Sequence, residues 1–203
     1  EGIHNFQHEF GGDVMLSDSK IHSEILYNKY DIFRRLYYLY MLAGVFMLMF
    51  TIMQIFKNNK AIRVGINFFH VLIGIFLLLH TAGLIARWYI SGHAPWSDAY
   101  ESMIYVAWAT MLFGLFFDRK SKLTIAAAAF VTSMILMIAH WNWMDPQIAN
   151  LQPVLNSYWL MIHVAVIVAS YGPFTLGMIL GIVALLLMLL TNDKNKEKMK
   201  LSI

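Results

Sequence analysis

Five long apolar runs constrain this chain more than any other feature of its sequence. They cover residues 36–56, 64–90, 102–117, 123–139 and 158–190. A helix needs about 20 apolar residues to cross the hydrocarbon core of a bilayer. The composition agrees, because 59% of the residues are hydrophobic and only 13% are charged. We therefore expect an all-α membrane protein, a polytopic helical bundle with about five transmembrane helices.

Basic residues gather in three short segments that the alternation of spans puts on one side of the membrane. Ten of the 15 Lys and Arg residues lie there: Lys57, Lys60, Arg63, Arg119, Lys120, Lys122, Lys194, Lys196, Lys198 and Lys200. Cytoplasmic loops carry such an excess, so this side is predicted to be cytoplasmic. The opposite side has the tryptophans typical of a membrane interface: Trp88, Trp96, Trp141, Trp143 and Trp159.

This topology divides the chain into three parts. Residues 1–35 are expected to form an outer, periplasmic tail, in which residues 25–35 have the pattern of an amphipathic lead-in on the membrane surface. Residues 36–191 form the transmembrane domain, and residues 192–203 form a basic cytoplasmic segment. The expected location is the inner membrane of a bacterium, with multiple passes and a functional periplasmic face.

The last apolar run is too long for one span. As a helix, residues 158–190 would reach about 50 Å, against a hydrocarbon core of about 30 Å. Pro173 is expected to kink or break this helix. Small residues are expected to let it pack closely on its neighbours: Ala165, Ala169, Ser170, Gly172, Gly177 and Gly181. The excess length predicts that the helix extends past the outer face and carries His163 to that surface.

Four other histidines lie in or beside the apolar runs, where ionisable groups usually have a role. His70 and His80 are too far apart along one helix to share a metal. Either could be an axial ligand of a haem, although hydrogen-bonded packing is the simpler interpretation. His93 is expected to fix a tight outer loop. His140 ends a helix, where an imidazolium complements the helix dipole.

His163 differs from these in its surroundings. Tyr158 and Trp159 precede it by about one helical turn. An aromatic shelf with one projecting imidazole suits a flat apolar cofactor with a polar edge, and we interpret His163 as a ligand of haem iron. The alternative is that these residues only anchor the helix at the interface.

Several other kinds of chemistry find no support in the sequence. The absence of Cys excludes disulfides, thiolate metal sites and cysteine nucleophiles within this chain. No carboxylate pair, Ser-His-Asp arrangement, Gly-rich phosphate loop or basic patch of the kind that binds nucleic acid stands out, so no nucleic-acid partner is expected. Asp98 and Glu101 precede the third span, where acidic side chains complement a helix N-terminus better than they suggest an acid–base pair.

Two stretches resemble a known family. L-Q-P-V-L-N-S-Y-W-L-M-I-H-V, at residues 151–164, resembles the L-Q-S-Y-W-L-x-x-H-V signature of the CcsA (ResC) haem-handling proteins of cytochrome c maturation, system II. R-W-Y-I-S-G-H-A-P-W-S-D-A-Y-E-S, at residues 87–102, resembles the outer loop R-W-Y-x-x-G-H-x-P-x-S-N-x-Y-E-S of the same family. The resemblance covers about residues 64–192, and the outer tail is typical of the fused CcsB–CcsA form.

The resemblance implies a membrane cytochrome c synthase. Such a protein brings haem b to the outer face and joins it to the Cys-x-x-Cys-His thiols of apocytochrome c. His163 matches the first outer axial histidine, with Tyr158 and Trp159 as candidate haem contacts. The implied partners are haem, apocytochrome c, membrane lipid and the remaining CcsB and CcsA parts of the same polypeptide.

The sequence also departs from the family pattern. The tryptophan-rich loop W-G-x-x-W-x-W-D and a second outer histidine normally follow the position of His163. The similar stretch W-N-W-M-D-P, at residues 141–146, precedes it, so the haem-shielding role is not assigned to that stretch. Asp98 stands where the family more often has Asn. Two alternative functions are a membrane haem b electron carrier that uses His70 or His80, and a purely structural helical bundle.

Overall fold

The protein is a bundle of long helices. The computed structural model describes Gly2, Phe6, Gly11 and residues 17–56, 59–117, 122–141, 144–148 and 157–190. Its main helices are α2 (Asp18–Tyr30), α3 (Ile32–Phe56), α4 (Lys60–Ser91), α5 (Ala99–Phe117), α6 (Lys122–His140) and α7 (Tyr158–Leu190). Five helical segments of the described chain are long and apolar enough to cross a membrane. The expected fold class, an all-α polytopic membrane protein, is therefore confirmed.

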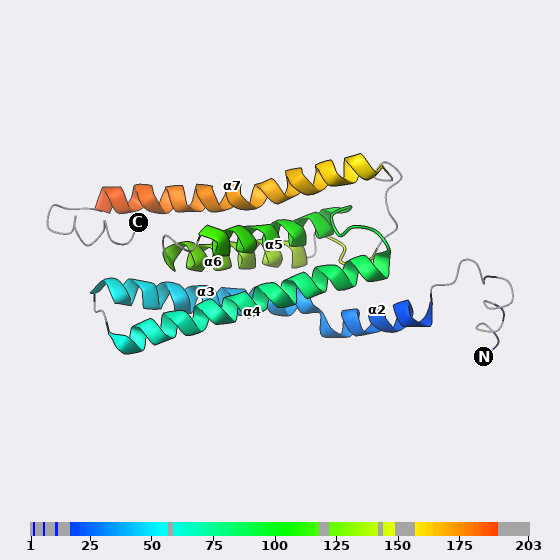
Figure 1. Cartoon of the computed structure of the whole chain (residues 1–203), viewed down its shortest axis with the longest axis horizontal. Helices are drawn as coiled ribbons and strands as arrows, with labels where there is room; N and C mark the ends of the chain where they lie inside the picture. Colours follow the sequence, from blue (N-terminus) through cyan, green and yellow to red (C-terminus); the bar gives the residue numbers. More distant parts are fainter. Residues whose placement is uncertain are drawn as a thin grey trace.

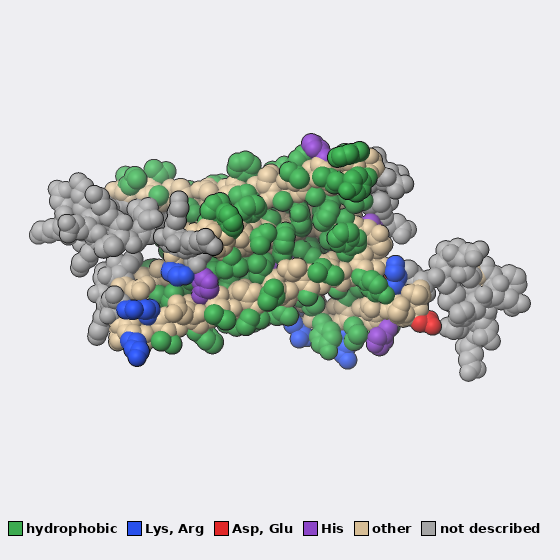
Figure 2. All heavy atoms as spheres, viewed as in Figure 1, with side chains coloured by type: hydrophobic (Ala, Val, Ile, Leu, Met, Phe, Trp, Pro, Cys, Tyr) green, Lys and Arg blue, Asp and Glu red, His purple; other side chains and the backbone are tan. Residues whose placement is uncertain are grey.

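Helices α3 to α6 form the centre of the bundle, and α7 lies along one side of it (Figure 1). The α3–α6 interface is close because small residues meet there: a Cβ added at Gly44 would lie 3.0 Å from the backbone nitrogen of Phe130 and 3.2 Å from the Ala129 Cβ. Buried side chains such as Tyr40, Met47 and Ile125 fill the centre. Large apolar side chains cover the outer surface of the helices, as expected for lipid contact (Figure 2).

The segment before the first span contains a helix boundary. The expected lead-in at residues 25–35 is divided between two helices, because Asp31 adopts a left-handed conformation with φ 41° and ends α2. α2 runs along the long axis of the bundle and packs against α4 (Figure 1). The placement of this segment on the membrane surface stays a prediction. Most of the tail before it, including His4 and His8, lies outside the described residues.

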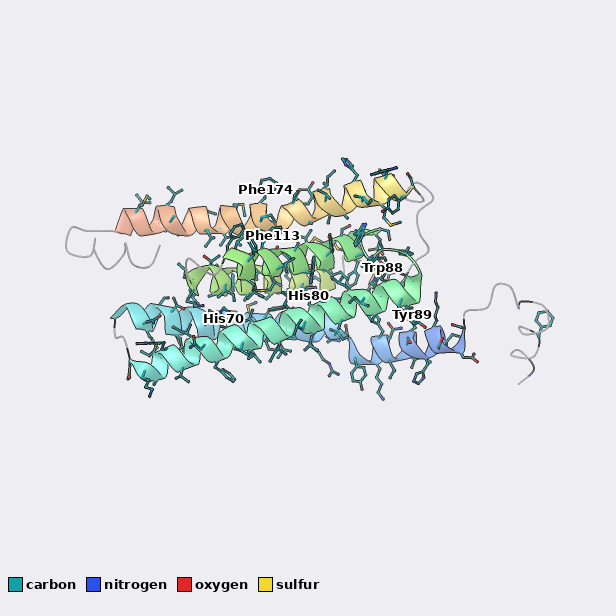
Figure 3. All side chains as sticks on the ribbon, in the orientation of Figure 1. His70, His80, Trp88, Tyr89, Phe113 and Phe174 are labelled. Carbon is teal, nitrogen blue, oxygen red and sulfur yellow. The ribbon has the colours of Figure 1, made fainter. Side chains whose placement is uncertain are left out.

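Charge and tryptophan separate between the two ends of the bundle. Lys60 and Arg63 begin α4 and Lys122 begins α6, at the end opposite to the α4–α5 connection (Figure 1). Trp88, in the last turn of α4, and Trp159, in the first turn of α7, lie at the α4–α5 end (Figures 1 and 3). Trp96 and Trp141 are also described, whereas the other residues behind the predicted orientation lie outside the described residues: Lys57, Arg119, Lys120, Trp143, Lys194, Lys196, Lys198 and Lys200.

The last helix is long, as expected, and contacts the bundle unevenly. α7 has 33 residues and continues without a break through Pro173. At Gly172 an added Cβ would lie 2.7 Å from the Thr110 backbone nitrogen, so α7 and α5 touch there. At Gly177 and Gly181 an added Cβ would meet nothing within 4 Å. The expected close packing is thus confirmed at Gly172 and wrong at Gly177 and Gly181, because those two glycines lie on the outward face of the helix.

Candidate functional site

The outer end of α7 carries the residues that the sequence singled out. His163 is exposed, and it lines an open hollow of about 550 Å³ together with Trp159, Leu160, Ile162 and Val166. Trp159 and His163 are four residues apart, so they lie on the same face of the helix. The Tyr158 ring contacts the edge of Trp159, with the ring centroids 5.8 Å apart, and does not line this hollow. The structure thus brings Trp159 and His163 together at one surface.

This hollow is mainly apolar, and the His163 imidazole is its one metal-binding group. An aliphatic wall from Leu160, Ile162 and Val166 adjoins the Trp159 indole and the His163 imidazole. An imidazole nitrogen is a good ligand for iron, zinc or copper. Such a surface can hold a flat apolar group whose centre needs a nitrogen ligand.

A neighbouring loop contacts the start of α7. The indole Nε1 of Trp96 donates a hydrogen bond of 3.2 Å to the carbonyl oxygen of Met161. Trp96 lies in the connection between α4 and α5, so this bond joins two segments that are 65 residues apart in the chain. The sequence predicted an interfacial position for Trp96, but its contact with α7 is visible only in the structure.

A buried ion pair lies below the same loop. Arg87 of α4 donates from Nε to Oε1 of Glu101 in α5 at 2.8 Å, and both side chains are fully buried. The other guanidinium nitrogens of Arg87 donate to the carbonyl oxygens of Pro146 at 2.9 Å and Gln147 at 3.0 Å. A buried charge is tolerated when its hydrogen-bonding groups are satisfied in this way. The pair therefore joins α4, α5 and the segment at residues 144–148.

This pair was not predicted from the sequence, and only part of its surroundings was. Asp98 caps α5 as expected, because its Oδ1 accepts from the Glu101 backbone N–H at 2.6 Å. Burial raises the pKa of the Asp98 carboxyl above its ordinary value, and the bond from the Glu101 N–H opposes that rise. Glu101, by contrast, is the buried partner of Arg87. One feature of the sequence could have predicted the pair: Arg87 lies in the last turns of an apolar span, and an Arg in such a position usually has a partner.

His93 fixes the outer loop, as the sequence suggested. Its Nδ1 lies 2.9 Å from the Ser97 hydroxyl and 3.2 Å from the Ala94 carbonyl oxygen. Ser97 also donates from its backbone N–H and its hydroxyl to Oε2 of Glu101, at 2.9 and 2.7 Å. These bonds connect the loop to the ion pair.

The histidines of α4 are separated along the helix and differ in burial (Figure 3). The His80 side chain is fully buried, and its Nε2 lies 3.1 Å from the carbonyl oxygen of Ile104. Phe33 packs against the imidazole, with the ring centroids 5.3 Å apart. His70 is half-buried, and its Nδ1 lies 3.4 Å from Nζ of Lys122. The hydrogen-bonded packing interpretation is confirmed for His80.

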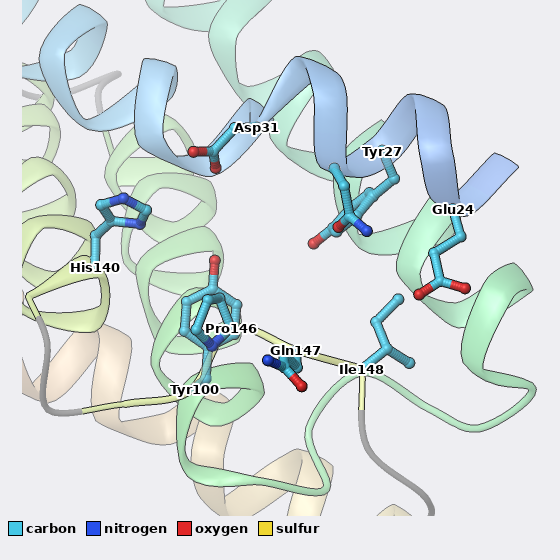
Figure 4. A pocket seen from close by; sticks show the side chains of 9 residues that line it. Glu24, Tyr27, Asp31, Tyr100, His140, Pro146, Gln147 and Ile148 are labelled. Atoms are coloured by element: carbon cyan, nitrogen blue, oxygen red, sulfur yellow. The ribbon is translucent and has the colours of Figure 1, made fainter.

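His140 lies at a different cavity from His163. It ends α6 as expected and helps to line a polar pocket of about 450 Å³ between α2, α5 and the 144–148 segment (Figure 4). The carboxylates of Glu24 and Asp31 and the hydroxyls of Tyr27 and Tyr100 also line this pocket. The structure therefore does not bring the two outer histidines to one site.

Comparison with known proteins shows the family of the chain. Residues 96–203 match the family model described as "Cytochrome C assembly protein". The chain belongs to this family. It is 42% identical over 186 residues, 91% of its length, to "Protein NrfI" of Wolinella succinogenes. It is also similar to proteins named "Cytochrome c biogenesis protein CcsA", with 37% identity over 57% of the chain in a Synechococcus strain and 34% over 70% in Parasynechococcus marenigrum.

The relatives are much longer than the matched region. The chain spans 20% of the Wolinella protein, and 37% and 48% of the two CcsA proteins. Its several long apolar helices indicate a multi-pass membrane protein. Its membership of the cytochrome C assembly family supports a role in cytochrome c biogenesis. The family match begins at Trp96, so it includes the end of the α4–α5 loop, the Glu101 side of the ion pair and the whole of α7.

Proposed function

We propose that this chain forms an outer haem-binding part of a cytochrome c synthase, with His163 as an axial ligand of haem iron. The observation that carries the proposal is the hollow at the start of α7, where an exposed imidazole stands beside a tryptophan and aliphatic side chains. This combination is suited to a cofactor that is flat, apolar and able to take a nitrogen ligand.

The donor set favours haem over a bare metal ion. A structural zinc site needs about four protein ligands. The described residues contain no group of three or more His, Asp or Glu side chains placed to hold a metal. Haem iron has its equatorial ligands from the porphyrin, so one or two protein ligands are enough. A lone histidine in an apolar hollow fits that requirement.

The residues of this hollow would then have distinct roles. His163 would hold the iron, while the Trp159 indole and the aliphatic wall would cover part of the ring and keep water from it. When bound, haem b supplies the vinyl groups that receive the thiols of the acceptor. The shielding loop and the second axial ligand would come from outside the described residues.

The partners follow from the same proposal. The acceptor is apocytochrome c with its Cys-x-x-Cys-His segment, and attachment adds each S–H across a vinyl double bond to form a thioether. The tryptophan-rich end of the bundle would face the periplasm of a bacterium and the basic end the cytoplasm. The remaining CcsB and CcsA parts and the surrounding lipid would complete the site.

The test is the removal of the imidazole in the native protein. His163→Ala should lower the bound haem or shift its Soret band, and it should stop the formation of holocytochrome c. Added imidazole should restore part of the haem signal in His163→Gly, because the deleted ring leaves room for a free ligand. His140→Ala is the matched control, since it removes an imidazole at the same end of the bundle but from a different cavity. An unchanged spectrum and an unchanged yield in His163→Ala would refute the assignment.

A further inference from the structure

The outer half of α7 has little support from the rest of the bundle. Tyr158 and Trp159 are 73% and 77% exposed, while the close contact with α5 occurs further along, at Gly172. Pro173 lies inside the helix and lacks the N–H that would bond to the Ala169 carbonyl. The helix is therefore weakened next to its main contact point.

Because the outer segment is long, a small rotation at Gly172 moves the outer turn of α7 by a large distance. Met161 lies eleven residues before Gly172, which corresponds to about 16 Å along a helix. A swing of about 10° at the contact point would displace the outer turn by about 3 Å, by the same helical rise. Such a displacement exceeds the length of a metal–nitrogen bond, which is about 2 Å. The placement of His163 thus depends on what holds the outer turn.

The hydrogen bond from Trp96 to Met161 holds this turn, and Trp96 is itself well supported. Its ring lies 5.0 Å from that of Tyr105, which stacks on Trp108 at 5.6 Å. The Trp108 indole donates to the Thr81 hydroxyl at 2.8 Å. We name Trp96, Tyr105 and Trp108 the aromatic column. It connects the outer loop to the interior of the α4–α5 interface.

The backbone beside Trp96 is fixed as well. Ser97 donates two hydrogen bonds to Oε2 of Glu101, and Oε1 of the same carboxylate is held by Arg87. The loop is thus attached to a fully buried ion pair on one side and to the aromatic column on the other.

We propose that Trp96 is a positioning residue that holds the outer turn of α7 and so places His163 for its ligand. The other two rings of the aromatic column, Tyr105 and Trp108, and the Arg87–Glu101 pair support Trp96. This inference rests on the proposed function of His163, but it assigns a role to a different residue. Trp96 binds the carbonyl oxygen of Met161, which is two positions before His163 in the chain.

Trp96→Phe is the sharpest variant, because it removes the indole N–H and keeps an aromatic ring against Tyr105. Trp88→Phe is the matched control: Trp88 contacts the Trp96 ring at 6.2 Å, but its own N–H makes no hydrogen bond within the described part of the chain. Spin labels can be placed at Tyr89→Cys and Ser157→Cys, which add the only two cysteines within this chain; any cysteine elsewhere in the polypeptide is replaced by Ser. In the native protein, the distance distribution between these labels should broaden in Trp96→Phe and stay narrow in Trp88→Phe. Equal distributions in both variants would overturn the inference.

The haem spectrum gives a second readout that a loss of general stability would not reproduce. In Trp96→Phe, the Soret band per folded protein should shift in the direction seen for His163→Ala, and the holocytochrome c yield should fall about tenfold, equivalent to the loss of one modest hydrogen bond. Added imidazole should reverse the shift. If His163→Ala alters the haem and Trp96→Phe does not, the positioning role is wrong while the proposed function stands. If neither alters it, the proposed function is wrong and the positioning role falls with it.

Discussion

Arg87 and Glu101 form a fully buried ion pair, with Nε and Oε1 2.8 Å apart, at the outer end of the bundle. The removal of two charges from water costs several kcal/mol per ion, and only close geometry with additional hydrogen bonds offsets this cost. Here the additional bonds reach carbonyl oxygens of the 144–148 segment and the backbone of Ser97. The pair is therefore the point at which the separate outer segments are joined.

Disruption of one partner should be more harmful than replacement of both. We expect Arg87→Met to lower the stability of the folded protein by about 3–5 kcal/mol, because it leaves the Glu101 carboxylate buried and unpaired. The double variant Arg87→Met with Glu101→Met should recover a large part of this loss. Thermal unfolding in detergent, followed by tryptophan fluorescence, measures both effects. Arg63→Met, at an exposed position of the same helix, is the control and should change the midpoint little.

The sequence could not reveal this pair, although it revealed the spans. Hydropathy and length are local properties, so five segments near the observed helices could be read directly. Arg87 and Glu101 are fourteen positions apart across a turn, and their contact depends on how residues 92–98 fold back. The bond between Trp96 and Met161 is harder still to anticipate, since 65 residues separate them. Asp31 adopts the left-handed conformation that ends α2. This helix boundary could not be predicted from the sequence, because Asp adopts that conformation only occasionally.

Two glycines in the middle of α7, Gly172 and Gly177, should respond oppositely to substitution by Ala. Gly172→Ala places a methyl group 2.7 Å from the Thr110 backbone nitrogen and 3.0 Å from the Ala109 carbonyl carbon, and neither backbone atom can move easily. We expect a loss of about 1–3 kcal/mol, as for other overpacked interfaces. Gly177→Ala meets nothing within 4 Å, so the higher helix propensity of Ala should leave stability equal or slightly increased. Parallel thermal unfolding of the two variants decides; equal losses in both would contradict the packing described for α7.

The orientation in the membrane can be tested with single cysteines, because the chain contains none. Lys60→Cys, at the start of α4, should react with a membrane-impermeant thiol reagent only after the cells are opened. Tyr158→Cys, at the start of α7, should react in intact spheroplasts, since its side chain is 73% exposed. The expectation follows from the basic residues at one end of the bundle and the tryptophans at the other. The reverse labelling pattern would place His163 in the cytoplasm and remove the basis of the proposed function.

Part of the candidate site was also accessible from the sequence. His163 and Trp159 could be paired in advance, because a spacing of four residues places them on one helical face whatever the tertiary structure. Tyr158 could not be placed in the same way, and the structure turns it against the edge of Trp159 and outside the hollow. The assignment of His140 to a separate polar pocket depends on the position of α2, which no local pattern indicates.

The electron-carrier alternative makes the opposite prediction for the histidines of α4. The His80 imidazole is fully buried, its Nε2 lies 3.1 Å from the Ile104 carbonyl oxygen, and the rings of Phe33 and Tyr40 pack beside it, so side chains of the bundle enclose it. We therefore expect His80→Gln, which keeps a hydrogen-bond donor at this position, to retain the haem spectrum per folded protein. His70→Ala should retain it as well. His163→Ala should lose or shift it. The absorption spectra of the three purified variants, normalised to folded protein, distinguish the two functions. Loss of haem in the His70 or His80 variant, with an unchanged spectrum in His163→Ala, would favour the electron carrier and refute our proposal.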